Sequence, residues 1–566
     1  MSKIRNFIFL FCVILLAACQ STPVQDSHRP DDHTQSTHEP RHDDGSEREF
    51  AEMRPGNRTP DELTIAFSRH EMELDFRKSY FANEAQIFTG IYEGLFSYHP
   101  YTLEPVPALA ERWELSEDKM QWTFTIRRNA RYWNGDSVRA EDFRAAWLSL
   151  IEPGSDSPYS SFFDVIEGAR DYRNGVSRDP NGVGIKAADQ RTLVIRLSSP
   201  ASFFPAMLCH HSFSPIHPSM IANAHWSPQV NQTNWTPPVS NGPFKISSMD
   251  NDSIIMEKNS QYWDQSNVAL NKITVKFADT ADDATHLWNS GEARWIAGDV
   301  NLETLTDRSG IQVNVMFATH YYFIRSSERP FNDHRVRRAM ALVLPWNEIR
   351  SDYYLPAETL IFPISGYPEV EGIIESNYEE ARRLMAEAGY ANPSGLPEIV
   401  IRLTPSYDAA RVGALMANAW KDILGFNVRV EVISYNRYHQ TMKEDGFTVG
   451  STSWIGDFAD PYAFLQMWRR DSNLNDARLD DPDFERLIER SMIEEGQVRL
   501  ATLAQAEKLL LDRGTVLPIY YSPALNIIDT GEMEGWYPNA LDIHPFKYMS
   551  FKTFRPLPGV AMLGIW

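Results

Sequence analysis

The chain has 566 residues, and its 54 lysines and arginines against 76 aspartates and glutamates give a net charge of −22 at pH 7. We expect no nucleic-acid partner, because binding to phosphates requires clustered positive charge. The length suffices for roughly two or three domains with a large core, and no later apolar run is long enough to span a bilayer.

The first nineteen residues have the pattern of a secretory leader. Lys3 and Arg5 precede an unbroken apolar stretch over residues 7–18, which is too short to cross a membrane but suits a signal peptide. Leu16, two alanines and Cys19 then resemble a bacterial lipobox. We therefore expect a signal peptide over 1–19, lipidation at Cys19, and a mature protein held outside the cytoplasm by a membrane anchor.

Residues 20–60 contain almost no large apolar side chains, so they cannot bury enough surface to fold and are expected to form a disordered tether. The histidines at positions 28, 33, 38 and 42 lack the spacing of a structural zinc site and have no cysteine beside them, so no metal is expected. Cys209 is the only cysteine beyond the leader and the lipobox, which excludes an intrachain disulfide in the body.

Strand-like and helical patterns alternate along the body. β-forming residues predict strands over 123–126, 192–197 and 272–277, and apolar residues at helical spacing predict a helix over 141–151. Ser376, followed three residues later by Glu379, predicts the start of another helix, and Gly389 its end. Because buried aromatic residues dominate packing, we expect the tryptophans at positions 113, 122, 133 and 147 in the core.

A strand–helix–strand unit is predicted further along the chain. Residues 399–403 indicate a strand, 409–424 a helix closed by Gly425, and 427–433 an alternating strand. This order and spacing are typical of a βαβ unit with a parallel strand pair. The body is therefore predicted to be α/β with mixed sheets.

The sequence contains no nucleophile elbow, no phosphate-binding loop and no His-Glu-x-x-His zinc motif. His70 and Glu71 begin like the last of these, but position 74 is leucine. His210 and His211 have no acidic or histidine partner at helical spacing, so we interpret them as core or surface residues. We expect neither enzymatic activity nor a cofactor.

Seven short segments of the body share one pattern when they are taken in order. They are Pro105-Val106-Pro107-Ala108-Leu109-Ala110-Glu111-Arg112-Trp113, Trp133-Asn134-Gly135-Asp136, Asn241-Gly242-Pro243-Phe244, Tyr262-Trp263-Asp264, Pro330-Phe331-Asn332-Asp333, Trp454-Ile455-Gly456-Asp457 and Leu517-Pro518-Ile519-Tyr520-Tyr521. Together they resemble the extracellular solute-binding proteins of family 5, which serve oligopeptide and dipeptide ABC importers. The resemblance covers about residues 63–547.

The resemblance implies a two-lobed, periplasmic-binding-protein-like α/β fold of the type II, large peptide-binding class. Such a fold has an extra domain and a ligand cleft between hinged lobes. Crossovers between the lobes are implied near 318 and 521. The implied division is lobe I over 61–92, 218–318 and 522–566, domain II over 93–217, and lobe III over 319–521.

The implied function is that of a substrate-binding lipoprotein, which captures extended oligopeptides and delivers them to the permease subunits of an ABC importer. An extended peptide can add its main chain to strand edges, so backbone hydrogen bonds give affinity without reading the sequence. Water in roomy pockets then adapts to varied side chains. We expect a monomer in the periplasm or on the cell surface, attached to the membrane through its N-terminal lipid.

The resemblance also implies which residues bind the peptide. Asp457 stands three places after Trp454, where peptide-binding relatives have an aspartate that accepts the α-ammonium group in a charge-assisted hydrogen bond. The other implied residues supply main chain from each lobe and one tyrosine side chain from the extra domain. The full implied set is Tyr80, Ala82, Tyr159, Trp454, Ile455, Gly456 and Asp457.

The positions that capture the peptide carboxylate in enteric relatives are not kept. Ser451 stands at the arginine position, about Ala409 at the histidine position, and Ile455 and Thr319 replace a cysteine pair. Longer peptides, another length preference or a ligand without a free carboxylate all fit this pattern. A nickel complex, an opine, a cell-wall peptide or a sugar bound by the same fold is an alternative, as is a surface hydrolase or adhesin.

Overall fold

The computed structural model describes residues 61–70, 72–221 and 237–552. The predicted signal peptide, the lipidation site at Cys19 and the tether lie outside the described residues. In the part of the chain that is described, no helix has the length and apolar character needed to cross a membrane.

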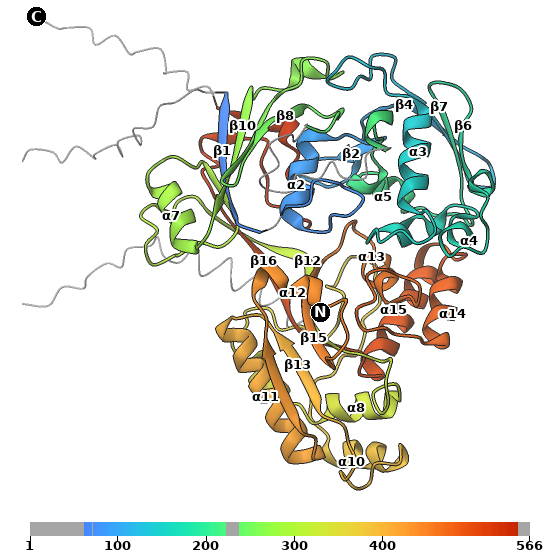
Figure 1. Cartoon of the computed structure of the whole chain (residues 1–566), viewed down its shortest axis with the longest axis vertical. Coiled ribbons are helices and arrows are strands. Elements are labelled where there is room, and N and C mark those ends of the chain that lie inside the picture. Colours follow the sequence, from blue (N-terminus) through green and yellow to red (C-terminus); the bar gives the residue numbers. More distant parts are fainter. Residues whose placement is uncertain (1–60, 71, 222–236, 553–566) are drawn as a thin grey trace, which may run out of the picture. The chain divides into compact units, whose positions relative to one another are not determined.

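A mixed ten-stranded sheet runs through the described residues (Figure 1). In spatial order its strands are β14 (Val428–Val432), β13 (Ile399–Leu403), β15 (Val449–Ile455), β12 (Ile311–Ile324), β16 (Val516–Ile528), β11 (Trp295–Ala297), β1 (Glu62–Ser68), β10 (Lys272–Ala278), β9 (Ser253–Lys258) and β8 (Phe244–Met249). Strands β13 and β1 are parallel to both of their neighbours, and the other pairs are antiparallel. The predicted α/β body with mixed sheets is confirmed.

The long strands β12 and β16 are neighbours in the middle of this sheet, between β15 and β11. The first half of β12 pairs with β16, and from Ala318 onward β12 also pairs with β15 along its other edge. The ladder between β12 and β16 is interrupted between the pairs Val315–Pro523 and Thr319–Tyr521. The crossovers implied near 318 and 521 coincide with this interruption. A hinge motion at this place stays a prediction, as does the division into lobes I and III and domain II.

The predicted βαβ unit is confirmed. Strands β13 and β14 are parallel, and helix α11 (Tyr407–Leu424) connects them. The helix begins before residue 409 because the side chain of Ser406 accepts a hydrogen bond from the N–H of Ala409 and caps the first turn. Gly425 ends the helix with a φ of 79°, a left-handed conformation that glycine adopts without steric cost.

Helix α10 (Tyr378–Glu387) corrects one prediction. Asn377, not Ser376, is its N-cap and accepts from the N–H of Glu380. The hydroxyl of Ser376 instead donates to the carbonyl of Leu344 at 2.6 Å. Serine and asparagine cap helices about equally well, so the tertiary contact with Leu344 decides between them. Gly389 follows the helix as predicted, with a φ of 92°.

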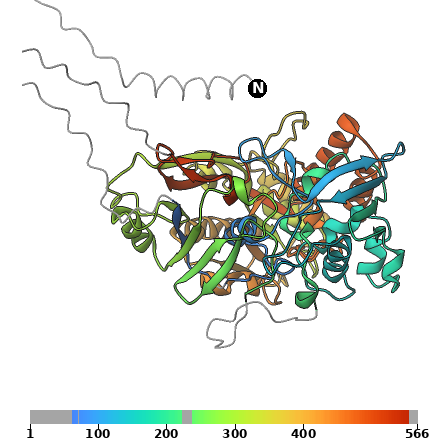
Figure 2. The same ribbon diagram turned by 90° about the horizontal axis from the view of Figure 1, so that it is seen from above.

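A separate antiparallel sheet has the order β4 (Ala110–Leu115), β5 (Gln121–Ile126), β7 (Thr192–Arg196) and β6 (Ile185–Ala187). Helix α3 (Ala140–Leu150) packs against β6 and β7, which confirms the predicted strands and helix in this region. Both views place this sheet away from strands β8–β10 (Figures 1 and 2). Trp122 and Trp147 are buried as predicted, but Trp113 is 39% exposed because it lies on the edge strand β4, and Trp133 is half-buried.

The other described elements are short strands and helices around these sheets. The strands are β2 (Phe96–Tyr98), β3 (Pro105–Pro107), β17 (Met533–Glu534) and β18 (Ser550–Phe551). The helices are α2 (Ala82–Ile91), α4 (Ala169–Arg173), α5 (Phe204–Met207), α6 (Pro218–Ile221), α7 (Ala281–Asn289), α8 (His334–Leu342), α9 (Trp346–Arg350), α12 (Tyr435–Thr441), α13 (Tyr462–Leu465), α14 (Pro482–Ser491) and α15 (Gly496–Asp512).

Candidate functional site

A cavity of about 1090 Å³ is lined by residues from the ranges of lobe I, domain II and lobe III. All seven residues implied by the resemblance line this cavity. They come from three places in the fold: the loop before α2, the segment after α3, and the end of β15 with the loop that follows it. Packing of distant parts of the chain therefore brings the implied set together.

The loop before α2 contributes two aromatic rings to the cavity. Tyr80 and Phe81 stack at 4.7 Å, and their rings lie 5.9 and 5.0 Å from the ring of His439 on α12. The loop before α2 and helix α12 therefore contact each other beside the cavity. Ala82 is the first residue of α2, so its backbone N–H has no partner within the helix and can serve a ligand.

Asp457 follows the end of β15, and its side chain is only 9% exposed. The hydroxyl group of Tyr159 interacts with its carboxyl group and favours the charged form, and the Nε2 atom of His210 lies 3.5 Å from its Oδ1 atom. The Oδ2 atom is buried and has no hydrogen-bond partner among the described residues. Because burial disfavours the charged form, the pKa of Asp457 is raised to about 8.

His210 was not predicted as a site residue. The prediction of a core or surface histidine is confirmed, because His210 is buried, but the residue also lines the cavity and faces Asp457. Sequence reasoning looked for an acidic partner at helical spacing, whereas the partner lies far along the chain. Burial lowers the pKa of His210 to about 3, so its ring is neutral at neutral pH.

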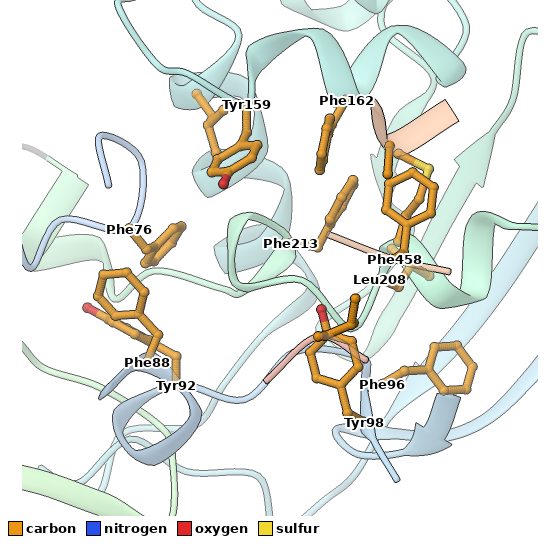
Figure 3. Packing of buried hydrophobic residues seen from close by; sticks show 14 of the residues in the cluster. Phe76, Phe88, Tyr92, Phe96, Tyr98, Tyr159, Phe162, Leu208, Phe213 and Phe458 are labelled. Carbon is orange, nitrogen blue, oxygen red and sulfur yellow. The ribbon is translucent and has the colours of Figure 1, made fainter. Parts of the chain in front are cut away.

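Aromatic packing fixes the walls around this pair. The ring of Tyr159 lies 4.9 Å from Phe162 and 6.4 Å from Trp454, and Phe162 meets Phe458 at 5.7 Å. Figure 3 shows the rings of Tyr159, Phe162 and Phe458 together with a second group of Phe76, Phe88 and Tyr92. Such edge-on and tilted contacts between buried rings stabilise one geometry, so the polar atoms that they carry are held in place.

Main-chain contacts fix the segment from Trp454 to Gly456. The indole N–H of Trp454 donates to the carbonyl of Ala463 at 3.2 Å, and the N–H of Gly456 donates to the carbonyl of Phe317 at 2.8 Å. A Cβ atom at Gly456 would lie 2.4 Å from the ring of Phe317. Glycine is therefore required for the close approach of the two chains beside the cavity.

Positive charge around the cavity is limited. Among the described lining residues the cations are Lys78, Lys443 and Lys547, with no arginine. Lys443 bonds to Asp476 and Lys547 pairs with Glu93, whereas Lys78 is exposed and forms no ion pair with another described residue. Ser451, which stands at the arginine position of enteric relatives, lines the cavity, but its N–H donates to the hydroxyl of Tyr438. The structure thus offers one free cation, Lys78, among the described lining residues.

No group of three or more histidine, cysteine, aspartate or glutamate side chains in the described ranges is arranged to hold a metal ion.

The family of bacterial extracellular solute-binding proteins, family 5 Middle, matches residues 104–476. This chain belongs to family 5. The match spans the segments that supply Tyr159, Trp454 and Asp457, and it places the protein among extracytoplasmic solute-binding proteins.

Curated relatives of family 5 match most of the chain. The periplasmic oligopeptide-binding protein OppA of Salmonella typhimurium is 28% identical over 473 residues, which cover 79% of this chain and 84% of the relative. The dipeptide-binding protein DppE of Bacillus subtilis is also 28% identical over 473 residues, with 79% and 83% covered.

A solved structure confirms the fold. The crystal structure of Haemophilus influenzae OppA in complex with RPPGFSPFR superposes with a TM-score of 0.76 at 21% identity, covering 87% of this chain and 99% of that chain. The two-lobed α/β fold of periplasmic peptide-binding proteins, predicted from the sequence, is therefore confirmed for this family 5 protein.

Proposed function

We propose that this family 5 protein is the substrate-binding component of an ABC importer and captures extended oligopeptides between hinged lobes. The names of its relatives support a peptide ligand, since they bind oligopeptides or dipeptides. The protein would hand its ligand to permease subunits without chemical change.

The observation that carries the proposal is the buried carboxyl group of Asp457, whose Oδ2 atom has no partner in the described structure. A buried acceptor without a partner costs free energy. The α-ammonium group of a peptide would supply both the missing hydrogen bond and the opposite charge. Every linear peptide with an unmodified amino terminus carries this group, so the site would recognise peptides regardless of sequence.

For the other end of the ligand, we propose that Lys78 meets the carboxylate. Its exposed side chain lines the cavity and forms no ion pair within the described ranges, whereas the arginine and histidine positions of enteric relatives are Ser451 and about Ala409. A flexible lysine at the rim suits carboxylates at varied distances from Asp457. This arrangement favours ligands of varied length.

Two further parts of the proposal concern the chain outside this cavity. Lipidation of Cys19 would hold the protein at a membrane through the tether, and lobe closure would pivot near 318 and 521. A Cys19→Ala variant should remain an unprocessed precursor that incorporates no labelled palmitate, because only a thiol at this position can take the diacylglyceryl group. Normal palmitate labelling of this variant would contradict the anchor.

The decisive experiment identifies what the protein carries. Native and denaturing mass spectrometry of the purified full chain should release peptides. A synthetic copy of such a peptide should reduce the radius of gyration in solution scattering, because a ligand that contacts both lobes favours the closed state. The peptide should be recovered uncut. Release of an opine, a sugar or a nickel complex would show that the ligand is not a peptide. Turnover of the peptide would favour the function of a hydrolase.

A further inference from the structure

We propose that His210 is a positioning residue for Asp457: it holds the Oδ1 atom and leaves Oδ2 directed at the cavity for an ammonium group. The inference rests on the proposed function, because it specifies how the amine of that ligand is recognised. It assigns a role to a histidine that neither the sequence pattern nor the resemblance singled out.

The geometry places a nearly immobile imidazole against the carboxyl group. The Nε2 atom of His210 lies 3.5 Å from Oδ1 of Asp457, and the two side chains are 6% and 9% exposed. The imidazole is enclosed by rings, with Tyr159 at 4.4 Å and His211 at 3.9 Å between centroids. It therefore cannot turn away from Asp457 without disturbing the wall of the cavity.

Local hydrogen bonding fixes which nitrogen carries the proton. The N–H of Ser212 donates to Nδ1 of His210 at 3.3 Å, so Nδ1 presents a lone pair. In a neutral imidazole the proton then lies on Nε2, which faces Asp457. Burial lowers the pKa of His210 to about 3, which keeps the ring neutral.

A neutral donor suits a site that must attract a cation. A charged imidazolium would pair with Asp457 and compete with the ligand, whereas a neutral N–H orients the carboxyl group and leaves its charge uncompensated. The two residues also belong to different parts of the fold, domain II and lobe III. The carboxyl group is therefore oriented by His210 only when these two parts are in contact, as they are in this structure.

The test compares full-length wild type with two variants, using synthetic oligoalanine peptides with free or acetylated amino termini as probes. His210→Phe fills the space without a donor, whereas His210→Gln keeps an N–H near the Nε2 position. We expect His210→Phe to weaken binding of free-amine peptides roughly 10- to 100-fold and to change acetylated peptides less than about threefold. His210→Gln should recover most of the affinity and of the preference for a free amine.

His217→Phe is the matched control. His217 forms the same kind of pair with Asp136, at 3.0 Å, but does not line the cavity, so this variant should bind like wild type. Equal losses for both peptide types in His210→Phe would show a packing role and overturn the inference, as would an unchanged preference for the free amine. If His210→Phe does not fold, His210→Leu, which also lacks a donor, replaces it. Wild type that binds neither peptide type would reject the proposed function itself, and the inference with it.

Discussion

The hydroxyl of Tyr98 donates a hydrogen bond to the main-chain carbonyl of Asp457 at 3.2 Å. This bond connects strand β2 with the loop after β15, which carries the carboxyl group of Asp457. Together with the interactions of Tyr159 and His210, it means that three residues from the range 98–210 contact Asp457. Removing the charge of Asp457 should therefore affect the ligand more than the fold.

Asp457→Asn is the first prediction. The substitution is nearly isosteric, keeps one acceptor oxygen and removes the charge that would face the α-ammonium group. We expect a loss of about 2–4 kcal/mol, or about 30- to 1000-fold in Kd, for free-amine peptides. The same substitution should lower the affinity for acetylated peptides only slightly. Calorimetry of both proteins with both peptides gives the coupling energy, and a coupling below about 0.5 kcal/mol would place Asp457 outside the amine site.

The second prediction concerns the release of a proton from Asp457 when the ligand binds. The pKa of Asp457 is raised to about 8, so in the empty site its carboxyl group is mostly protonated at pH 7. A bound ammonium group stabilises the carboxylate and lowers this pKa. Binding at pH 7 should therefore release close to one proton, and affinity should rise as the pH increases toward about 8. Calorimetry in phosphate and in Tris measures this release, which should vanish in Asp457→Asn.

The same pKa shift has a consequence for the unliganded protein. Between about pH 4 and pH 8 Asp457 is ionised in the unfolded chain but still protonated in the fold, so the folded state binds more protons. The contribution of Asp457 to the free energy of unfolding should therefore fall as the pH rises through this window. A smaller decline in Asp457→Asn is the expected result, and an identical decline in both proteins would contradict it.

The third prediction concerns a buried ionic network that joins residues 164–173 to residues 469–485. Arg173 contacts Asp164 at 2.8 Å and Asp471 at 3.1 Å, and Arg469 contacts Asp164 at 3.4 Å and Glu485 at 3.3 Å. The two arginine side chains are 6% and 4% exposed. Arg469→Met would leave buried carboxylates short of a partner, which typically costs about 3–5 kcal/mol.

The control for this network is the exposed pair of Lys119 with Glu495, at 3.0 Å and with side chains 57% and 51% exposed. It also connects segments far apart in the chain, but exposed pairs contribute only roughly 0–1 kcal/mol. Urea unfolding should therefore show a large shift of the midpoint for Arg469→Met and almost none for Lys119→Met. Similar shifts for the two variants would show that burial does not set the strength of these contacts.

The fourth prediction tests the close approach at Gly456. In Gly456→Ala the new methyl group would meet the buried rings of Phe317 at 2.4 Å and Phe464 at 3.0 Å. Rings in a packed core cannot yield without strain, so we expect a loss of about 1–3 kcal/mol in the free energy of unfolding, together with weaker peptide binding. Gly182→Ala, where nothing lies within 4 Å of the new atom, should keep wild-type stability. Unchanged stability of Gly456→Ala would reject the packing argument.

Local patterns in the sequence were enough to predict much of the fold. The βαβ unit of β13, α11 and β14 could be predicted from the apolar periodicity and from the glycine that ends the helix, Gly425. Both signals come from residues that are neighbours in the sequence. Local reasoning failed where a distant contact decided the outcome. Ser376 is a good capping residue, but its hydroxyl bonds to Leu344, and Asn377 caps the helix instead.

The sequence by itself determined the family, the leader pattern and the candidate carboxylate, because the segment from Trp454 to Asp457 is contiguous and its spacing is readable. Only the tertiary structure decided that His210 faces Asp457 at 3.5 Å and that Oδ2 is buried without a partner. The physical reason is that both facts depend on how the segment around His210 packs against the distant segment around Asp457. That packing removes the pair from water, and no pattern of neighbouring residues records it.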